Sequence, residues 1–543
     1  MKKYKNIHQS RSQMNNIDQK GWKIKLLVML SLAMFFAMSG CKKFLDKEPT
    51  FIVKENYYNN ETDVNAGVAG VYDVLGKEEI YGGNYQLLLS VADDGFYSRS
   101  AYTFGPAVYN FDASDPAVAN FWRFLYEGIE RANVFLTRID GVNMGQAAKD
   151  AAKGEVKFLR AYYYFLLVDN WGNVPLKTTP TVSVNDVNIK ATPQKEIYDF
   201  ITKEMEEAEG LVKTATAIGF GGRVSKSTVR GILARVYLKM AGAPLRDQTK
   251  YAEALKWARK IVFPDGGPKE HRLLPSYQQI FTNYAGDKYD VGETIWEVEL
   301  YGNRGGDFES GRVGNTFGLQ CNDEVHGYSY GLVNATKKLF DSYENQDVRK
   351  NWAIAPYQYV YQTVNTLVTV TDSTNWTSAQ IYNRNVGKFR RAYEKLKPKN
   401  KNYTPQNFPL LRYADVLLMF AEAENEVNGA SSLAKQALKE VRDRANASDV
   451  IPSISSYEDM KTAIRKERFL ELSFESLRKF DLVRWDMFVS EMNQLGTSIQ
   501  ADAPAAWSFA AMAAKNVSSR NNLLPIPVLE LSLNKAMSQN TGW

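Results

Sequence analysis

Residues 155–175 read EVKFLRAYYYFLLVDNWGNVP, and this stretch decides the fold class of the chain. Its apolar side chains recur every three or four residues, which is the spacing of one buried face of an α-helix: Phe158, Leu159, Tyr162, Phe165 and Leu166. Gly172 and Pro175 then follow Trp171, a combination that ends a helix. The pattern predicts a helix over about residues 147–170 that packs against other helices.

The same helical spacing continues on both sides of this stretch. It predicts helices over residues 62–75, 121–139, 196–211, 226–241, 251–262, 413–427, 433–445, 457–474 and 477–492. Polar turns such as Asn428-Gly429 join consecutive helices into helix–turn–helix units. No strict repeat signature is present, so the fold class is mainly α, with degenerate tetratricopeptide-like helical repeats.

Residues 264–409 have a different character. They are rich in Gly, Asn, Tyr and Thr, and β-branched residues over Val360–Val370 predict a strand. Irregular segments held on a rigid scaffold commonly carry binding surfaces. We therefore expect two helical regions, residues 61–263 and 410–543, to support a loop-rich ligand face over residues 264–409.

The N-terminus has the parts of a secretory signal. Lys20, Lys23 and Lys25 precede an apolar run of thirteen residues, 26–38, which ends in Ser39-Gly40-Cys41. As a helix this run is about 20 Å long, too short for a ~30 Å bilayer core. Cysteine after two small residues resembles the bacterial lipobox, although Met38 stands where leucine is usual.

These features predict a signal peptide over residues 1–40, an acylated (palmitate-bearing) Cys41 and a polar tether over residues 41–60. An ordinary signal peptide with an incidental cysteine is the alternative, and Met14 is an alternative start.

The whole chain has 67 basic and 61 acidic side chains, but removal of residues 1–40 leaves 60 of each. The balanced mature chain gives no general attraction for nucleic acid.

Histidine and cysteine are scarce in the mature chain. Only His271 and His326 remain there, which leaves little material for a zinc site or a serine triad. Cys321 has no partner for a disulfide once Cys41 is acylated, so we expect it to be a small buried side chain. The sequence thus predicts a protein that is not an enzyme and has no cofactor.

Three further motifs accompany residues 155–175. Residues 411–423 read LRYADVLLMFAEA, residues 464–485 read IRKERFLELSFESLRKFDLVRW, and Pro525-Ile-Pro527 precedes Glu530, Asn534 and Gln539-Asn540. In this order and spacing they resemble the SusD/RagB family of outer-membrane lipoproteins, over the whole mature chain. The resemblance implies four degenerate tetratricopeptide units that support an irregular ligand-binding half.

The resemblance also implies a function and a partner. Members of this family act as cell-surface lids on a TonB-dependent outer-membrane barrel of the SusC type and capture nutrients for import. Glycans are their commonest ligands, and one branch handles peptides. We therefore expect an oligosaccharide-binding protein anchored to the outer membrane by its lipid, without nucleic acid as a partner. The identity of the sugar stays open.

The motif residues themselves indicate structure rather than catalysis. In residues 464–485 charges of opposite sign lie three or four residues apart and could meet along one helical edge. We expect scaffold ion pairs and packing, with contact to a partner or ligand as the alternative, at Arg412, Asp415, Arg468, Glu471, Glu475, Arg478, Asp481 and Trp485. Arg160, on a mostly apolar helix, is expected to pair with a buried carboxylate.

Sugar binding needs aromatic faces beside polar side chains, and two segments supply both. The candidates in residues 93–109 are Asp94, Tyr97, Arg99 and Tyr102, and those in residues 301–330 are Tyr301, Asn303, Tyr328 and Tyr330. Trp352 and Trp376 are weaker candidates. No invariant binding motif of the family supports these choices, which depend on composition and position.

Asp93-Asp94-Gly95 suggests other uses as well. Paired carboxylates are the machinery of glycosidases, but neighbouring side chains on one chain usually diverge. A helix N-cap, a turn or a bound calcium ion are simpler uses. A non-catalytic oligosaccharide-binding protein is thus the leading hypothesis, and a peptide-capturing lid, a surface glycosidase and a solenoid adaptor are the alternatives.

Overall fold

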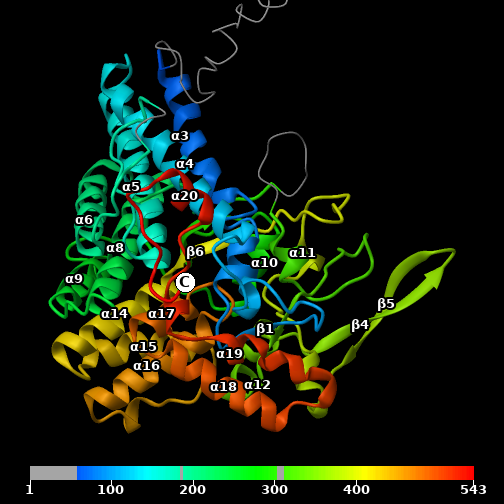
Figure 1. Cartoon of the computed structure of the whole chain (residues 1–543). Helices are drawn as coiled ribbons and strands as arrows, with labels where there is room; N and C mark the ends of the chain where they lie inside the picture. The colour runs from blue at the N-terminus through cyan, green and yellow to red at the C-terminus, as the bar shows by residue number, and fades with distance from the viewer. Residues whose placement is uncertain (1–57, 184–186, 302–310) are drawn as a thin grey trace, which may run out of the picture. The chain divides into compact units, whose positions relative to one another are not determined.

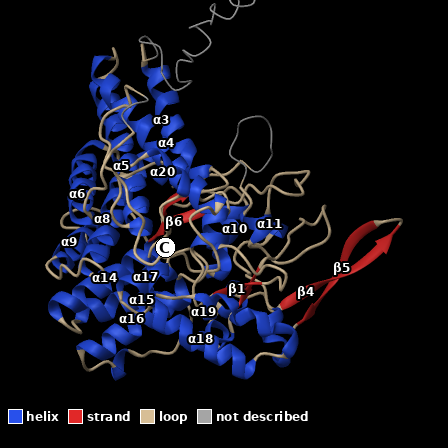
Figure 2. Cartoon of the chain, viewed as in Figure 1, coloured by secondary structure: helices blue, strands red, loops and turns tan. Residues whose placement is uncertain are grey.

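The computed structural model describes residues 58–183, 187–301 and 311–543 of this chain. Helices make up most of it, with three small pairs of strands (Figure 2), so the mainly α prediction is confirmed. The expected signal peptide, Cys41 and nearly all of the tether lie outside the described residues. Within those residues no helix is both long and apolar enough to cross a membrane.

The first helical region forms a layered stack. Its helices are α3 (Glu61–Gly76), α4 (Pro116–Arg138), α5 (Gln146–Trp171), α6 (Gln194–Leu211), the short α7 (Ala215–Ile218), α8 (Lys226–Ala241) and α9 (Lys250–Val262). Helix α5 packs between α4 and α6, and α8 packs on α6 and α9 (Figure 1). Asp115 caps α4 by accepting hydrogen bonds from two backbone N–H groups, and Gly172 ends α5 with a φ of 76°.

The last helical region packs against this stack through α14, which contacts both α8 and α9. Its helices are α14 (Tyr413–Asn428), α15 (Ser432–Arg444), α16 (Tyr457–Glu471), α17 (Arg478–Arg484), α18 (Phe488–Asp502), α19 (Met512–Asn516) and α20 (Val528–Leu533). The predicted boundaries of α14 and α15 agree with the structure within about two residues.

Two predictions in this region were wrong. The helix expected over residues 457–474 ends at Glu471, and the helix expected over 477–492 is divided into α17 and α18. Phe474 and Ser476 both have a φ of 62°, in the left-handed region that helices exclude. The Phe474 N–H donates to Asp94 Oδ2 at 2.8 Å, so a contact from a distant part of the chain holds this turn.

The loop-rich segment contains the short helices α10 (Tyr277–Ala285), α11 (Val313–Thr316), α12 (Lys337–Ser342) and α13 (Lys350–Ala353). Its strands pair in antiparallel fashion as β1 (Gly95–Tyr97) with β3 (Val333–Ala335), β2 (Thr294–Val298) with β6 (Phe408–Arg412), and β4 (Tyr357–Val364) with β5 (Leu367–Asn375). Strand β1 comes from the first helical region and β6 crosses into the last one, so backbone hydrogen bonds tie the loop-rich segment to both.

The single strand expected over residues 360–370 was wrong in extent. The segment is a hairpin that projects from the body (Figure 2), with its turn at Asn365 and Thr366. Both turn residues have positive φ values, 48° and 69°, as two-residue hairpin turns require. Asparagine followed by threonine is a weaker turn signal than asparagine followed by glycine, which is why the sequence did not reveal the break.

Buried charges join the loop-rich segment to the last helical region. We call the following set the core charge cluster: Glu293, Asp347, Arg349, Lys388, Arg412, Arg442, Arg444, Glu467, Glu471 and Glu475. Arg412 bridges three carboxylates in it, with nitrogen–oxygen distances of 2.9 Å to Glu293, 3.0 Å to Glu471 and 2.8 Å to Glu475. Because α16 ends at Glu471, these charges meet across different elements instead of along one helical edge.

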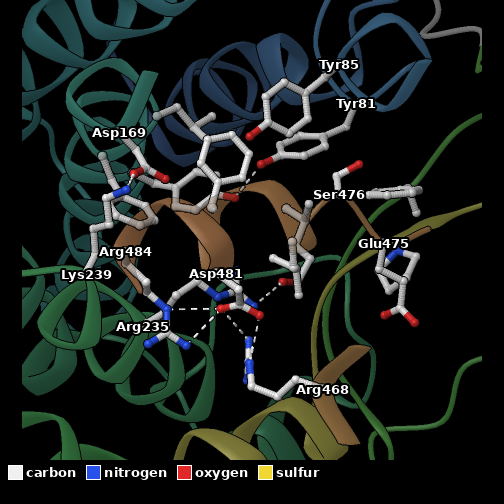
Figure 3. Close-up of a pocket in the computed structure, with 18 residues that line it drawn as sticks. Tyr81, Tyr85, Asp169, Arg235, Lys239, Arg468, Glu475, Ser476, Asp481 and Arg484 are labelled. Carbon is white, nitrogen blue, oxygen red and sulfur yellow. Dashed lines mark hydrogen bonds and ion pairs between the residues drawn. The ribbon is translucent and has the colours of Figure 1, made fainter. Parts of the chain in front are cut away.

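A second group of ion pairs surrounds an interior pocket of about 50 Å³ (Figure 3). Arg468 contacts Asp415 at 2.7 Å and Asp481 at 2.8 Å. Lys239 and Asp169 form a separate pair on the same pocket. The volume suits a few water molecules and is too small for a sugar ring.

The remaining motif residues also contact charged groups. Arg160 pairs with Glu204 at 2.5 Å, and Arg478 pairs with Asp93 at 2.7 Å. The indole N–H of Trp485 donates to Glu422 at 2.8 Å. All of these contacts lie within the scaffold.

Glu297 on β2 gives a testable pH effect. Its carboxyl group is buried and accepts a long hydrogen bond of 3.4 Å from Asn407. Burial, with Glu299 nearby, raises the pKa of Glu297 to about 8, from 4.5 when exposed. The stability that this group contributes is therefore complete below about pH 4.5 and is lost as the pH rises through about 8.

We expect the Glu297→Gln variant to gain thermal stability relative to the natural chain as the pH rises from 5 to 8. Glutamine is a neutral mimic of the protonated carboxyl and needs no proton at the higher pH. Melting temperatures of both proteins across this range measure the effect, and the control is Glu253→Gln, at a side chain that is 37% exposed. Parallel curves for Glu297→Gln and the natural chain would contradict the raised pKa.

Candidate functional site

A cavity of about 290 Å³ lies at the base of the β4–β5 hairpin. Six parts of the chain build it: the residues after β1, the loop before β3, β3 itself, the hairpin, the segment after β5 and the segment after α18. We call it the amide-lined cavity, and its lining residues are Ser98, Arg99, Leu319, Gln320, Asn322, Asn334, Gln358, Tyr359, Tyr361, Trp376, Asn383, Asn385 and Trp507.

Four aromatic side chains contribute to this lining. Tyr359 and Tyr361 come from β4, where a bulge after Val360 changes the pairing register. Trp376 follows β5, and its indole N–H is buried without a hydrogen-bond partner in the part of the chain that the structure describes. Trp507 packs edge-on against Phe96, with ring centres 6.0 Å apart. Half-buried rings of this kind offer flat apolar faces to a ligand.

The amide side chains of the lining divide into a hydrogen-bonded pair and a set without hydrogen-bond partners among the described residues. Asn385 donates to the side-chain oxygen of Asn334 at 2.6 Å, and Asn334 donates to the Tyr382 carbonyl at 2.7 Å. Other amide side chains have no hydrogen-bond partner among the described residues: Gln320, Asn322, Gln358 and Asn383. Each of these can both donate and accept, which matches the hydroxyl groups of a polyol.

Arg99 joins the two segments that the sequence singled out. Its guanidinium donates to the Ser98 hydroxyl at 2.6 Å and to the Tyr330 carbonyl. The Ser98 hydroxyl in turn donates to the Gly331 carbonyl at 2.8 Å. Ser98 and Arg99, at the wall of the amide-lined cavity, therefore lie beside Tyr330 and Gly331.

The other candidates between positions 93 and 109 do not line the amide-lined cavity. Tyr97 and Tyr102 stack with ring centres 4.3 Å apart. Asp94 is buried under the turn at Phe474, and burial, with Asp93 nearby, raises its pKa to about 6. Burial acts against ionisation of Asp93 too, but Arg478 and Lys338 hold its pKa down to about 2. Both oxygens of Asp93 thus face cations of the protein, at 2.7 Å and 2.6 Å.

The candidates between positions 301 and 330 that the structure describes do not line the amide-lined cavity, and they differ in exposure. Tyr301 is 53% exposed and Tyr328 packs against Tyr330, with ring centres 5.1 Å apart, outside the lining. Asn303 falls outside the described residues. Trp352 is buried beneath the guanidinium of Arg390. Cys321 is buried, in agreement with the sequence analysis.

The sequence analysis missed most of the amide-lined cavity. Of its candidates, Arg99 and Trp376 line it. The alternation of Tyr357, Tyr359 and Tyr361 was a signal that could have identified the hairpin face. Nothing local marked Trp507 or Asn385, because each gains its position only through the tertiary fold.

A larger surface hollow of about 400 Å³ lies beside α10, and it is a weaker candidate. Its lining is Gln278, Gln279, Thr282, Gly286, Lys288, Tyr393 and Lys395. It offers one aromatic ring, against four in the amide-lined cavity. In the described residues no group of three or more His, Cys, Asp or Glu side chains could hold a metal ion.

A helical scaffold that carries a loop-built, aromatic and amide-lined cavity defines the class of protein. The family model described as "SusD family" matches residues 292–543, and the one described as "Starch-binding associating with outer membrane" matches residues 43–238. The chain belongs to the SusD-like proteins.

Individual relatives agree with this assignment. The chain is 25% identical to SusD-like protein P25 of Formosa agariphila, over 94% of this chain and 98% of that protein. It is 23% identical to the starch-binding protein SusD of Bacteroides thetaiotaomicron, over 88% of this chain and 89% of that one. The crystal structure of a SusD homolog from Bacteroides thetaiotaomicron matches with a TM-score of 0.82 and 26% identity, over 91% of this chain and 99% of that one.

A laminarin-binding SusD-like protein has the same fold as this chain. The TM-score is 0.69 at 23% identity, over 90% of this chain and 100% of that one. At this identity the similarity shows the fold alone.

Proposed function

We propose that this chain is a non-catalytic glycan-binding protein and that the amide-lined cavity is its ligand site. The observation that carries the proposal is the combination of four half-buried aromatic rings with four amide side chains that lack partners among the described residues. A sugar supplies what these groups lack, since its hydroxyls accept and donate while its C–H face covers a ring.

The relatives support a glycan as the ligand. One solved structure with this fold is a laminarin-binding protein, and another is a surface glycan-binding protein in complex with laminarihexaose. The lining of the amide-lined cavity contains no Asp, Glu, His or Cys side chain. Without such a group at the ligand there is no general acid or base for glycoside hydrolysis, which supports binding without turnover.

The cellular setting is part of the same proposal. Acylation of Cys41 would hold the protein on the outer membrane, with residues 41–60 as tether, and the SusC-type TonB-dependent barrel would be its partner in import. The lipobox-like sequence and the family described as associating with the outer membrane support this setting. We propose the helical regions 61–263 and 410–543 as the support of the ligand face 264–409.

Calorimetric titration with a panel of oligosaccharides tests the proposal. We expect at least one glycan to bind in the micromolar range, as a 290 Å³ cavity with four rings allows. We also expect each glycan to be recovered uncleaved after prolonged incubation with the protein. Binding of peptides without any glycan would favour the peptide-capturing alternative, and cleavage of a bound glycan would show an enzyme.

A further inference from the structure

Arg99 differs from the arginines of the scaffold in the groups that it contacts. Arg412, Arg349 and Arg484 each contact two or more carboxylates. Arg99 donates to the Ser98 hydroxyl and to the carbonyls of Ser98, Tyr330 and Gly331, which are all neutral acceptors. No carboxylate of the described residues lies within 4.0 Å of it, so its charge at the cavity wall is not balanced by an ion pair.

Three further cations lack a carboxylate partner and lie close to residues of the lining, although they do not line the cavity themselves. Arg384 donates to the carbonyls of Trp376 and Thr377, and Arg390 donates to the Asn351 carbonyl at 2.7 Å. Lys399 donates to the carbonyl of His326, whose ring contacts Tyr359. None of the three has an ion pair with a described carboxylate.

Two pieces of chemistry indicate that these charges are poorly compensated. The Nε atoms of Arg384 and Arg390 are buried without a hydrogen-bond partner among the described residues. Burial lowers the pKa of both guanidinium groups and lowers that of Lys399 to about 8. A buried cation with no counter-charge raises the free energy of the protein unless a ligand supplies an anion.

The nearby carboxylates do not provide that counter-charge. Asp323 adjoins the lining residue Asn322, but its oxygens accept hydrogen bonds from the backbone N–H groups of Val325, His326 and Val370 at 2.8–3.0 Å. Glu324 pairs with Lys401 at 2.7 Å. Asp372 is exposed on β5, where it accepts from the N–H of Ser373.

We propose that the amide-lined cavity selects an anionic saccharide, one that carries a carboxylate or a sulfate ester, and that Arg99 binds the anionic group. The proposal rests on the glycan-binding function and specifies its ligand. Arg99 supplies a planar guanidinium, which suits a carboxylate or a sulfate, while the amides and rings bind the neutral part of the sugar. Arg384, Arg390 and Lys399 add a positive field around the cavity.

Two matched pairs of ligands test this inference. One pair is oligogalacturonate and its methyl ester, and the other is a sulfated carrageenan oligosaccharide and its desulfated form. Calorimetry at low and high salt measures all four. We expect the anionic member of one pair to bind at least about tenfold tighter than its neutral form, with the advantage reduced by salt. The pair that responds identifies the anion as carboxylate or sulfate.

The Arg99→Gln variant removes the proposed anion contact. We expect the preference for the anionic member to fall to about twofold or less, while the neutral form binds as before. Arg99→Lys should keep part of the preference, because the charge remains. Arg123→Gln removes an exposed arginine of α4 and should keep all of it. The unfolding midpoint of each variant shows whether it is folded.

The outcomes separate this inference from the function on which it rests. Equal affinity for both members of each pair would overturn the anionic preference and leave glycan binding in place. An unchanged preference in folded Arg99→Gln would overturn the role of Arg99. Failure of all four ligands and of the whole oligosaccharide panel to bind would overturn both proposals.

Discussion

Replacing Arg412 with methionine is expected to lower the free energy of unfolding by about 3–5 kcal/mol. The side chain is buried and contacts Glu293, Glu471 and Glu475 within 3.0 Å. Its removal leaves buried carboxylates with too few cations, and the cost of an unpaired buried charge exceeds that of a lost exposed ion pair several times over. Methionine keeps most of the volume, so the lost charge dominates the change.

Chemical denaturation followed by tryptophan fluorescence measures this effect. The control is Lys439→Met, which removes a surface cation that lies 2.6 Å from Asp443 and should change the unfolding free energy far less than Arg412→Met does. Arg412→Met and Lys439→Met with equal midpoints would show that the core charge cluster does not stabilise the fold. A double variant that also replaces Glu475 with glutamine should recover part of the loss, because it removes one of the unpaired carboxylates.

Replacing Trp376 with alanine is expected to weaken glycan binding by about thirtyfold, which corresponds to about 2 kcal/mol. Tryptophan has the largest aromatic face of the side chains that line the amide-lined cavity, and Trp376 is half-buried there. The ring is half-buried and contributes little to the hydrophobic core, so the melting temperature should stay nearly unchanged. This separation of binding from stability distinguishes a ligand contact from a packing residue.

Titration with the tightest-binding member of the oligosaccharide panel measures the effect. Trp376→Phe keeps a ring and should recover most of the affinity. Phe104→Ala is a matched control, because Phe104 is an exposed aromatic residue (59%) that does not line the cavity. If Trp376→Ala and Phe104→Ala bind equally well, the ligand site lies elsewhere on the protein.

Sequence periodicity predicted a helix well wherever the apolar spacing of the segment matches the face that it buries. The helix over residues 226–241 agrees with α8 at both ends, because Ser225 supplies the N-cap and the apolar spacing runs unbroken to Ala241. Periodicity failed between Glu471 and Arg478. There the apolar and charged residues still follow a helical pattern, but Asp94 holds Phe474 in a left-handed turn. No local signal reports a hydrogen bond to a residue 380 positions away.

The candidate site was harder to predict than the scaffold, for a physical reason. The amide-lined cavity draws its walls from segments near residues 99, 320, 334, 360, 380 and 507, and each contributes a few side chains. Composition identified residues 93–109 and 301–330 as aromatic and polar, and these segments meet where Arg99 donates to the Tyr330 carbonyl. Composition could not show that Asp94 faces the turn at Phe474 or that Trp507 reaches the cavity.

The long-range ion pairs also affect the order in which the chain can fold. Asp93 pairs with Arg478, 385 residues later, and the indole N–H of Trp171 donates to the Pro525 carbonyl, 354 residues later. During synthesis the early carboxylates and polar groups have no partners and favour water over burial. These two contacts can therefore form only when nearly the whole chain has been made, so the parts of the interior that they close are completed last.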